Sequence, residues 1–263
     1  VNAGLILANQ PGLELQAFGS IDQSAGGELR GDAGVVGLGT VLITNGFFDG
    51  QNGGMVETLA GNTSTVAGVT SLGAAGVRGG GVMAIGTGGL ANLGTLTVNS
   101  RTEVSNALLR FDADATINGP GRIDLNQNTA DIFDARITTS AGVAGTNGDQ
   151  HTIAGYGSMD GEFINDGLIL ADRPGLDLRI AGTVDQTGGG TLRADEGHIG
   201  LATVTITGGA FDGINGGIVD TIGGGTATVA GVTSTGQAGI RENAVMAIAA
   251  GGLVNQGTLT VNT

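Results

Sequence analysis

The sequence predicts an all-β fold, and among all-β folds it favours a parallel β-solenoid. The 263 residues include 54 glycines but only seven phenylalanines, one tyrosine and no tryptophan, so the core must be narrow and aliphatic. Short apolar segments recur roughly every 8–12 residues and several alternate with polar residues, which is the pattern of strands with one buried face. The chain also repeats itself, as solenoids do.

The internal repeat is gapless. Residues 1–100 align with residues 164–263 at a constant offset of 163, and about 61 of the 100 aligned positions are identical. We therefore expect one continuous solenoid over residues 1–263, with a full unit over 1–163 and a partial second unit over 164–263. One inserted residue would move every later side chain of a strand to the opposite face. Because the alignment has no insertion, equivalent side chains such as Leu96 and Leu259 should point the same way.

The elements follow in order along each unit. Segments 4–8, 65–71, 82–85 and 94–99 are apolar strands that return at 167–171, 228–234, 245–248 and 257–262. In the unduplicated middle, residues 107–117 indicate one strand with its odd positions buried, and Phe133, Ala135 and Ile137 indicate the buried side of another. Gly, Asn and Asp mark the corners, where positive φ is tolerated, and Asn can also form ladders between coils.

Coil length sets the dimensions of the rod. Coils of about 20–24 residues would give roughly a dozen coils, and at ~4.8 Å per coil the rod would be roughly 50–60 Å long. A sandwich or antiparallel barrel would need more large aromatic residues in its core. A propeller would show a period near 40–45 residues with aromatic signatures, and neither is present.

Composition excludes several kinds of function. The ten basic residues are all arginine and the formal net charge is −14, which argues against nucleic acid and anionic membranes as partners. Without cysteine or lysine there is no disulfide framework, thiol catalysis, Schiff base or P-loop. No apolar run approaches the ~20 residues of a membrane span, so no membrane insertion is expected.

Four phrases are typical of one coil type. Asn92-Leu93-Gly94-Thr95-Leu96, Asn255-Gln256-Gly257-Thr258-Leu259 and Ile164-Asn165-Asp166-Gly167-Leu168, with a looser version over 151–159, follow an Asn-x-Gly-x-Leu pattern. In this the chain resembles bacterial surface proteins of the filamentous-haemagglutinin and autotransporter-passenger kind. The resemblance implies a right-handed β-helix, export to the cell surface, and adhesion or work in a biofilm matrix.

Two equivalent corners are the main candidates for a metal. Asp49 and Asn52 in the first unit, and Asp212 and Asn215 in the second, could offer oxygen ligands to calcium. The nonapeptide rhythm of calcium-binding β-rolls is absent, and a tight corner explains these residues without metal. We therefore expect no cofactor, with calcium at these corners as the alternative.

The acidic middle segment is the candidate for catalysis. Close carboxylates could serve acid–base work on a polysaccharide, with Arg110, Arg122 and Arg136 near enough in sequence to hold it. An ordinary solvated face explains the same residues, so we expect no enzyme and keep a carbohydrate-active β-helix as the alternative. The acids concerned are Asp112, Asp114, Asp124, Asp131 and Asp134.

Other polar residues receive structural interpretations. His151 and His198 are expected at the surface or at corners, and Arg30 and Arg193 are expected to pair with Asp32 and Asp195 on one exposed face. Thr-x-Thr pairs could bind ice if they stacked regularly, but their spacing is irregular, so ice binding is a minor alternative. The pairs begin at Thr63, Thr95, Thr203, Thr226 and Thr258.

The function expected from the sequence is mechanical. We expect a structural or adhesive module of a long, acidic, secreted or surface-attached repeat protein, serving as a shaft, filament or display surface. Its partners would be further copies of itself, stacked head-to-tail, and host or matrix glycans or neighbouring cells. The chain starts and stops within coil phrases, as a segment of a longer tandem array would.

Overall fold

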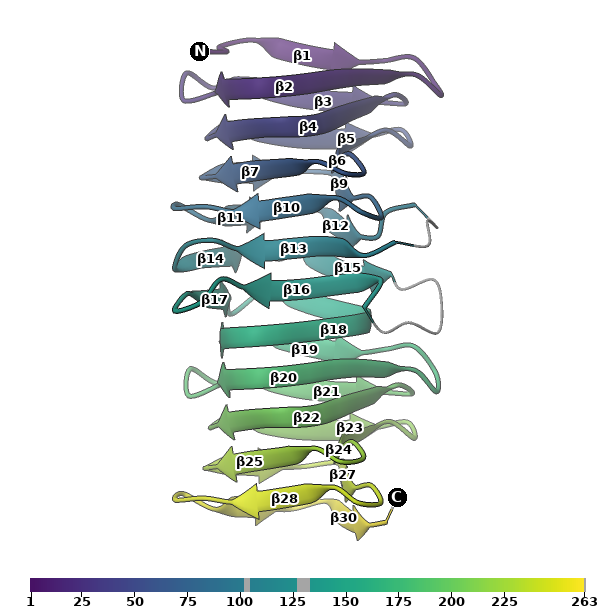
Figure 1. Ribbon diagram of the computed structural model, residues 1–263, viewed down its shortest axis with the longest axis vertical. Helices are drawn as coiled ribbons and strands as arrows, with labels where there is room; N and C mark the ends of the chain where they lie inside the picture. The colour runs from purple at the N-terminus through teal and green to yellow at the C-terminus, as the bar shows by residue number, and fades with distance from the viewer. Residues whose placement is uncertain (102–104, 127–132, 263) are drawn as a thin grey trace.

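The fold is a β-solenoid, as the sequence predicts. The computed structural model describes residues 1–101, 105–126 and 133–262, and within these ranges it contains thirty strands, all paired in parallel, and no helix. About twelve coils are stacked into a rod, with the first strands at one end and the last at the other (Figure 1).

The strands are β1 (Leu5–Ala8), β2 (Glu14–Asp22), β3 (Glu28–Asp32), β4 (Val35–Thr44), β5 (Phe47–Gln51), β6 (Met55–Thr58), β7 (Thr63–Ala67), β8 (Val69–Ser71), β9 (Ala74–Val77), β10 (Val82–Ile85), β11 (Leu90–Asn92), β12 (Thr95–Val98), β13 (Ala107–Phe111), β14 (Ala115–Asn118), β15 (Arg122–Asn126), β16 (Ala135–Thr139), β17 (Ala144–Asn147), β18 (Thr152–Asn165), β19 (Leu168–Ala171), β20 (Asp177–Asp185), β21 (Thr191–Asp195), β22 (His198–Thr207), β23 (Ala210–Ile214), β24 (Ile218–Thr221), β25 (Thr226–Ala230), β26 (Val232–Ser234), β27 (Gln237–Ile240), β28 (Val245–Ile248), β29 (Leu253–Asn255) and β30 (Thr258–Val261).

The strands form three columns that run along the rod. One column runs from β1 through β3, β5, β8, β11, β14 and β17 to residues 162–165 of β18. The other two pass through β6, β9, β12 and β15, and through β7, β10, β13 and β16. As the chain descends in Figure 1, front strands run to the left and rear strands to the right, which makes the helix right-handed.

The core consists of stacked aliphatic side chains, one layer per coil. Parallel pairing in register places each inward residue on the inward residue of the next coil, so alternation in the sequence becomes a continuous buried column. Phe111 and Phe163 add one edge-to-face contact, with ring centroids 6.3 Å apart. The longest aliphatic stack is Val36, Val56, Ala75, Leu96, Ile123, Ile153, Ile169 and Leu192, all buried.

Asparagine and glycine supply most corners with positive φ. Asn45, Asn52 and Asn99 adopt left-handed conformations, as do many of the glycines. No aspartate does so among the described residues, which differs from the sequence expectation. Ala33 and Glu196 also have positive φ, at 62° and 63°, although neither side chain favours it. They are equivalent positions, so the two units share the same strained corner before β4 and β22.

The two units adopt the same structure. Each strand from β1 to β12 returns 163 residues later with the same bounds, as β19 to β30. In Figure 1, β2 and β20 both lie at the front, with β3 and β21 behind them. The hydrogen-bonded columns nevertheless shift, because β19 pairs with residues 152–154 of β18 and not with residues 162–165. Each hydrogen-bonded column therefore winds gradually around the rod axis over the length of one unit. Strands that are equivalent in the two units belong to different columns but face the same side of the rod.

The terminal coils have apolar side chains that no neighbouring coil covers. Leu259 is 37% exposed, whereas its equivalent Leu96 is 1% exposed. Leu259 nevertheless stacks in register on the buried Ala238, so it points inward like Leu96. The difference in exposure comes from its position in the last coil of this chain.

The middle segment departs from the predicted alternation at two places. Residues 107–117 form two strands, β13 and β14, because the chain bends at 112–114. Phe133 is exposed and Asp134 is buried, which reverses the expected sides. The reversal places the Phe133 ring under the guanidinium groups of Arg136 and Arg179, at 5.1 and 5.7 Å. The attraction between the guanidinium cations and the face of the Phe133 ring favours this exposed position of the ring.

Among the described residues, no helix could cross a membrane.

Candidate functional site

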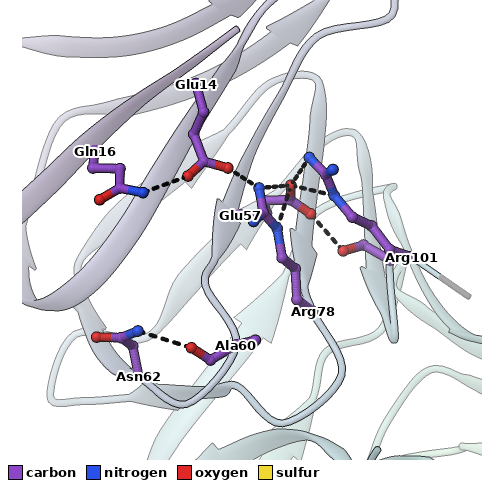
Figure 2. Close-up of polar contacts among 8 residues, drawn as sticks. Glu14, Gln16, Glu57, Ala60, Asn62, Arg78 and Arg101 are labelled. Carbon is purple, nitrogen blue, oxygen red and sulfur yellow. Dashed lines mark hydrogen bonds and ion pairs between the residues drawn. The ribbon is translucent and has the colours of Figure 1, made fainter. Parts of the chain in front are cut away.

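An arginine clamp joins side chains from four coils on one edge of the rod. The Glu57 side chain, on β6, is fully buried and accepts hydrogen bonds from Arg78 Nε at 2.8 Å and Arg101 Nη2 at 2.6 Å (Figure 2). Ser100 donates to its other oxygen at 2.6 Å. Arg78 also binds Glu14, 64 residues earlier in the chain. Burial raises the pKa of Glu14, but hydrogen bonds from Gln16 and Arg78 outweigh it, so the pKa is lowered overall.

Small residues make room for this clamp. Gly37 lies between Gln16 and Glu57 in the column, and a Cβ there would be 2.7 Å from Leu59 and 3.0 Å from Glu14. The next residue below Glu57 is Gly76. Side chains at these two positions would occupy space taken by the clamp and by Ser100. The sequence pattern gave no sign of this arrangement, since the members lie on different coils.

The second unit rebuilds the clamp with shorter acids and a histidine. Arg241 donates to both oxygens of Asp177, at 3.0 and 2.8 Å, and to Asp220 at 2.8 Å. Arg241 also lies 2.9 Å from Nδ1 of His198, a partly exposed residue that replaces Val35 of the first unit. Burial raises the pKa of Asp220, and the hydrogen bond from Arg241 opposes that rise.

The proposed calcium corners turn their polar groups toward neighbouring coils. The amide of Asn52 donates to Asp32 at 2.8 Å, and the amide of Asn215 donates to Asp195 at 2.8 Å. Asp49 accepts from Gln51 and lies 3.4 Å from Arg30, while Asp212 accepts from Arg193 at 2.8 Å. Across the described ranges, no group of three or more acidic or histidine side chains could hold a metal ion.

These contacts correct the expected surface pairs. Arg30 pairs with Glu28 at 2.6 Å and with Asp49 of the next coil, not with Asp32. Arg193 pairs with Asp212 and not with Asp195. Stacking in register places Asp49 of the next coil directly beneath Arg30. The guanidinium of Arg30 can therefore pair with an acid of the next coil as well as with an acid of its own strand.

The acids of the middle segment are distributed over different faces. Asp112 binds Arg110 and Ser140, and Asp114 accepts from the backbone of Ala144 at 2.8 Å. They flank the bend between β13 and β14, whereas Asp124 lies on β15 in another column. Asp134 is buried beside β13, its carbonyl bonded to the amide of Ala107. Asp131 lies outside the described residues.

A further pair of carboxylates converges on an arginine, outside the two clamps. Arg122 donates to Asp124 at 2.9 Å and to Asp172 at 2.8 Å, and Arg173 lies 3.3 Å from Asp124. Asp172 and Arg173 come from the loop after β19 and were not identified from the sequence. We call these four residues the middle ionic cluster. Its two acids and two arginines balance in charge.

Two open hollows on the described surface lie elsewhere. One is lined by residues 7–10 and 13–15 at the first coil, and another by Gly19, Val41 and neighbouring threonines. Neither includes a residue of the middle ionic cluster or of either arginine clamp apart from Glu14.

Threonines stack over three successive coils of the second unit. Thr183, Thr205 and Thr228 are in register, with Glu162 above and Ala247 below. In the first unit the equivalents are Ser20, Leu42 and Thr65. The ladder is therefore short and belongs to one unit only.

Buried amides and one histidine form a ladder inside a corner of the rod. Asn147 donates to Asn165 at 2.7 Å, which donates to Gln186 at 2.8 Å. His151 bonds both Asn147 and Asn92, and it is fully buried. This corrects the expectation that His151 lies at the surface. An asparagine ladder between coils was anticipated, but its continuation through a histidine was not.

No protein-family model matches this chain, and none of the curated proteins or solved structures compared with it matches it.

Proposed function

We propose that the chain is a structural and adhesive module of a long, acidic, secreted or cell-surface repeat protein. It serves as a rigid shaft whose sides display the same surface once per unit. The observation that carries this proposal is the single thirty-stranded sheet, in which every coil bonds to the next and equivalent strands of the two units face the same way. A rod of this kind transmits force along its axis through many parallel hydrogen bonds.

The side chains support a mechanical role. Arginines are used to join coils: Arg78 and Arg241 each bridge acids that are 64 and 21 residues away. The resemblance of its coil phrases to those of bacterial surface proteins is the reason for placing the chain outside the cell or on a bacterial surface, and the absence of cysteine agrees with export through a membrane pore. Matrix or host glycans and neighbouring cells are the partners that this display surface would meet.

The proposal of a rigid shaft can be tested by measuring the length of proteins that contain one, two or more tandem copies of the 163-residue unit. A unit spans about seven coils, so each added unit should lengthen the rod by roughly 35 Å at ~4.8 Å per coil. We expect small-angle scattering and electron microscopy to show straight particles that lengthen in these steps at constant width. Bent particles with a hinge at every unit would contradict a rigid shaft.

A carbohydrate-active function is the alternative that one observation favours. Asp124 and Asp172 meet at Arg122, as the acids of a polysaccharide-cleaving site would. For the shaft, we expect no release of reducing ends from a panel of acidic and neutral polysaccharides. Turnover that is lost in Asp124→Asn would establish the enzyme instead. The threonine ladder suggests ice binding as a minor alternative, and thermal hysteresis would reveal it.

A further inference from the structure

The buried ladder joins the first unit to the second through His151. Asn92 lies on β11 of the first unit, and Asn165 and Gln186 belong to the second. Between them stand Asn147 and His151 of the unduplicated middle. All five side chains are at most 3% exposed. We call this continuous set the seam.

Each hydrogen bond in the seam fixes the direction of the next. Asn92 Nδ2 donates to the carbonyl of Arg122 at 3.1 Å and to Nε2 of His151 at 3.0 Å, so that Nε2 carries no proton. The other nitrogen, Nδ1, lies 2.7 Å from Oδ1 of Asn147 and donates to it. Asn147 can accept there because its Nδ2 donates to Asn165.

The seam therefore requires a neutral imidazole with its proton on Nδ1. A second proton on Nε2 would face the amide protons of Asn92 and remove the side-chain hydrogen bond between the middle segment and β11 of the same unit. Asn92 could not simply turn over, because its oxygen would then face the carbonyl of Arg122. A charged, unpaired group in a buried site carries a large desolvation cost.

Charged residues on the segments around His151 are paired elsewhere or exposed, so they do not compensate a protonated His151. The guanidinium of Arg122, whose carbonyl bonds Asn92, is held by Asp124 and Asp172. Asp149, in the turn before His151, is exposed, and the carboxylate of Asp166 is directed over Gly188. Among the described residues, no ion pair to His151 is formed. Burial lowers the pKa of His151 to about 4.

We propose that His151 makes the seam an acid-sensitive joint between the units. Protonation breaks the ladder and opens the coils around β15 to β19, while the coils on either side stay closed. The rod would then be rigid at neutral pH and would acquire one flexible point per unit in acid.

Two measurements on the full chain test this joint. The first is an NMR titration of the two histidines, in which we expect His151 to titrate near pH 4 and to show the Nδ1–H tautomer at pH 7. A midpoint near 6.5, or the other tautomer, would overturn the proposal even if no variant folded.

The second measurement is hydrogen exchange, expressed as protection factors at pH 7 and pH 4. From the ordinary pKa of 6.5 and the lowered one, we expect opening of residues 152–171 to increase roughly a hundredfold, with little change over residues 28–51. His151→Gln keeps one donor and one acceptor but does not titrate, so it should abolish the increase. The matched control His198→Val, which restores the residue of the first unit, should keep it. Uniform opening along the rod, or an increase that survives in His151→Gln, would refute the joint.

Discussion

At the scale of single residues, buried charge is placed where arginines from two other coils can reach it. The carboxylate of Glu57 is inaccessible to solvent, but both of its oxygens accept hydrogen bonds, from Arg78, Arg101 and Ser100. A buried ion pair contributes little net stability compared with apolar residues, but removing one member leaves the other charge without compensation. The clamp therefore acts more on which coils can stack than on the total free energy of folding.

Glu57→Ala should destabilise the rod strongly. We expect a loss of about 3–5 kcal/mol in the free energy of unfolding, because Arg78 and Arg101 would lose their shared partner. Glu28→Ala is the control, since its pair with Arg30 is partly exposed and should contribute at most about 1 kcal/mol. Urea denaturation of both variants compares them. Equal, small effects would show that the clamp is dispensable.

Gly50 illustrates a second demand at this scale. A Cβ at Gly50 would lie 2.2 Å from the carbonyl oxygen of Ala74, and one at its equivalent Gly213 would lie 2.3 Å from that of Gln237. Backbone cannot move away as a flexible side chain can. We expect Gly50→Ala to cost roughly 1–3 kcal/mol or more, measured by the shift in Tm.

Gly4→Ala is the matched control for Gly50. Gly4 does not have a positive φ, and a Cβ added there would have its nearest non-neighbouring atom 4.0 Å away, so the Tm should change little. If both variants melted alike, close approach of the coils would not explain the glycine content.

At the scale of strands, alternation decides which side chains carry the stability. Phe47 and Phe48 are adjacent on β5, but Phe48 is buried and Phe47 is exposed. Phe48 stacks on Leu29 above and Ser71 below. The same alternation returns at Ala210 and Phe211, where the exposed aromatic ring has been replaced and the buried one kept.

Phe48→Ala should cost about 3–5 kcal/mol, because it leaves a cavity between two coils. Phe47→Ala removes the same number of atoms from an exposed site and should change the unfolding free energy by well under 1 kcal/mol. Chemical denaturation of the pair measures the difference. Comparable losses would mean that β5 is packed on both faces.

At the scale of the whole molecule, stacking is the only means by which a coil covers its neighbour's core. In this chain the terminal coils leave apolar residues only partly covered, among them Ile6 at one end and Ile248 and Val261 at the other. Such ends can join head-to-tail, which produces filaments and not closed rings.

We therefore predict end-to-end association of the 263-residue chain as concentration rises, with its charge of −14 opposing lateral contact. Sedimentation velocity over a wide concentration range measures it. Ile6→Lys should weaken association, because Ile6 stacks on the buried Leu29 in the first coil, whereas Leu42→Lys on the side of the rod should not. A strict monomer at high concentration would contradict head-to-tail stacking.

The sequence alone determined the β-solenoid, the extent of the repeat and the inward side of most strands. These properties follow from period-two alternation, glycine at corners and a constant offset of 163 residues, all of which are visible in the sequence without knowing which residues stack on one another. It did not determine the partners of Arg30, the burial of His151 or the reversal at Phe133 and Asp134. Contacts between coils depend on how much chain separates stacked residues. That length varies, since Arg122 stacks on Thr152 thirty residues later and Thr152 on Leu168 after only sixteen. Only the tertiary structure fixes this register, and the register brings the clamps, the middle ionic cluster and the seam together.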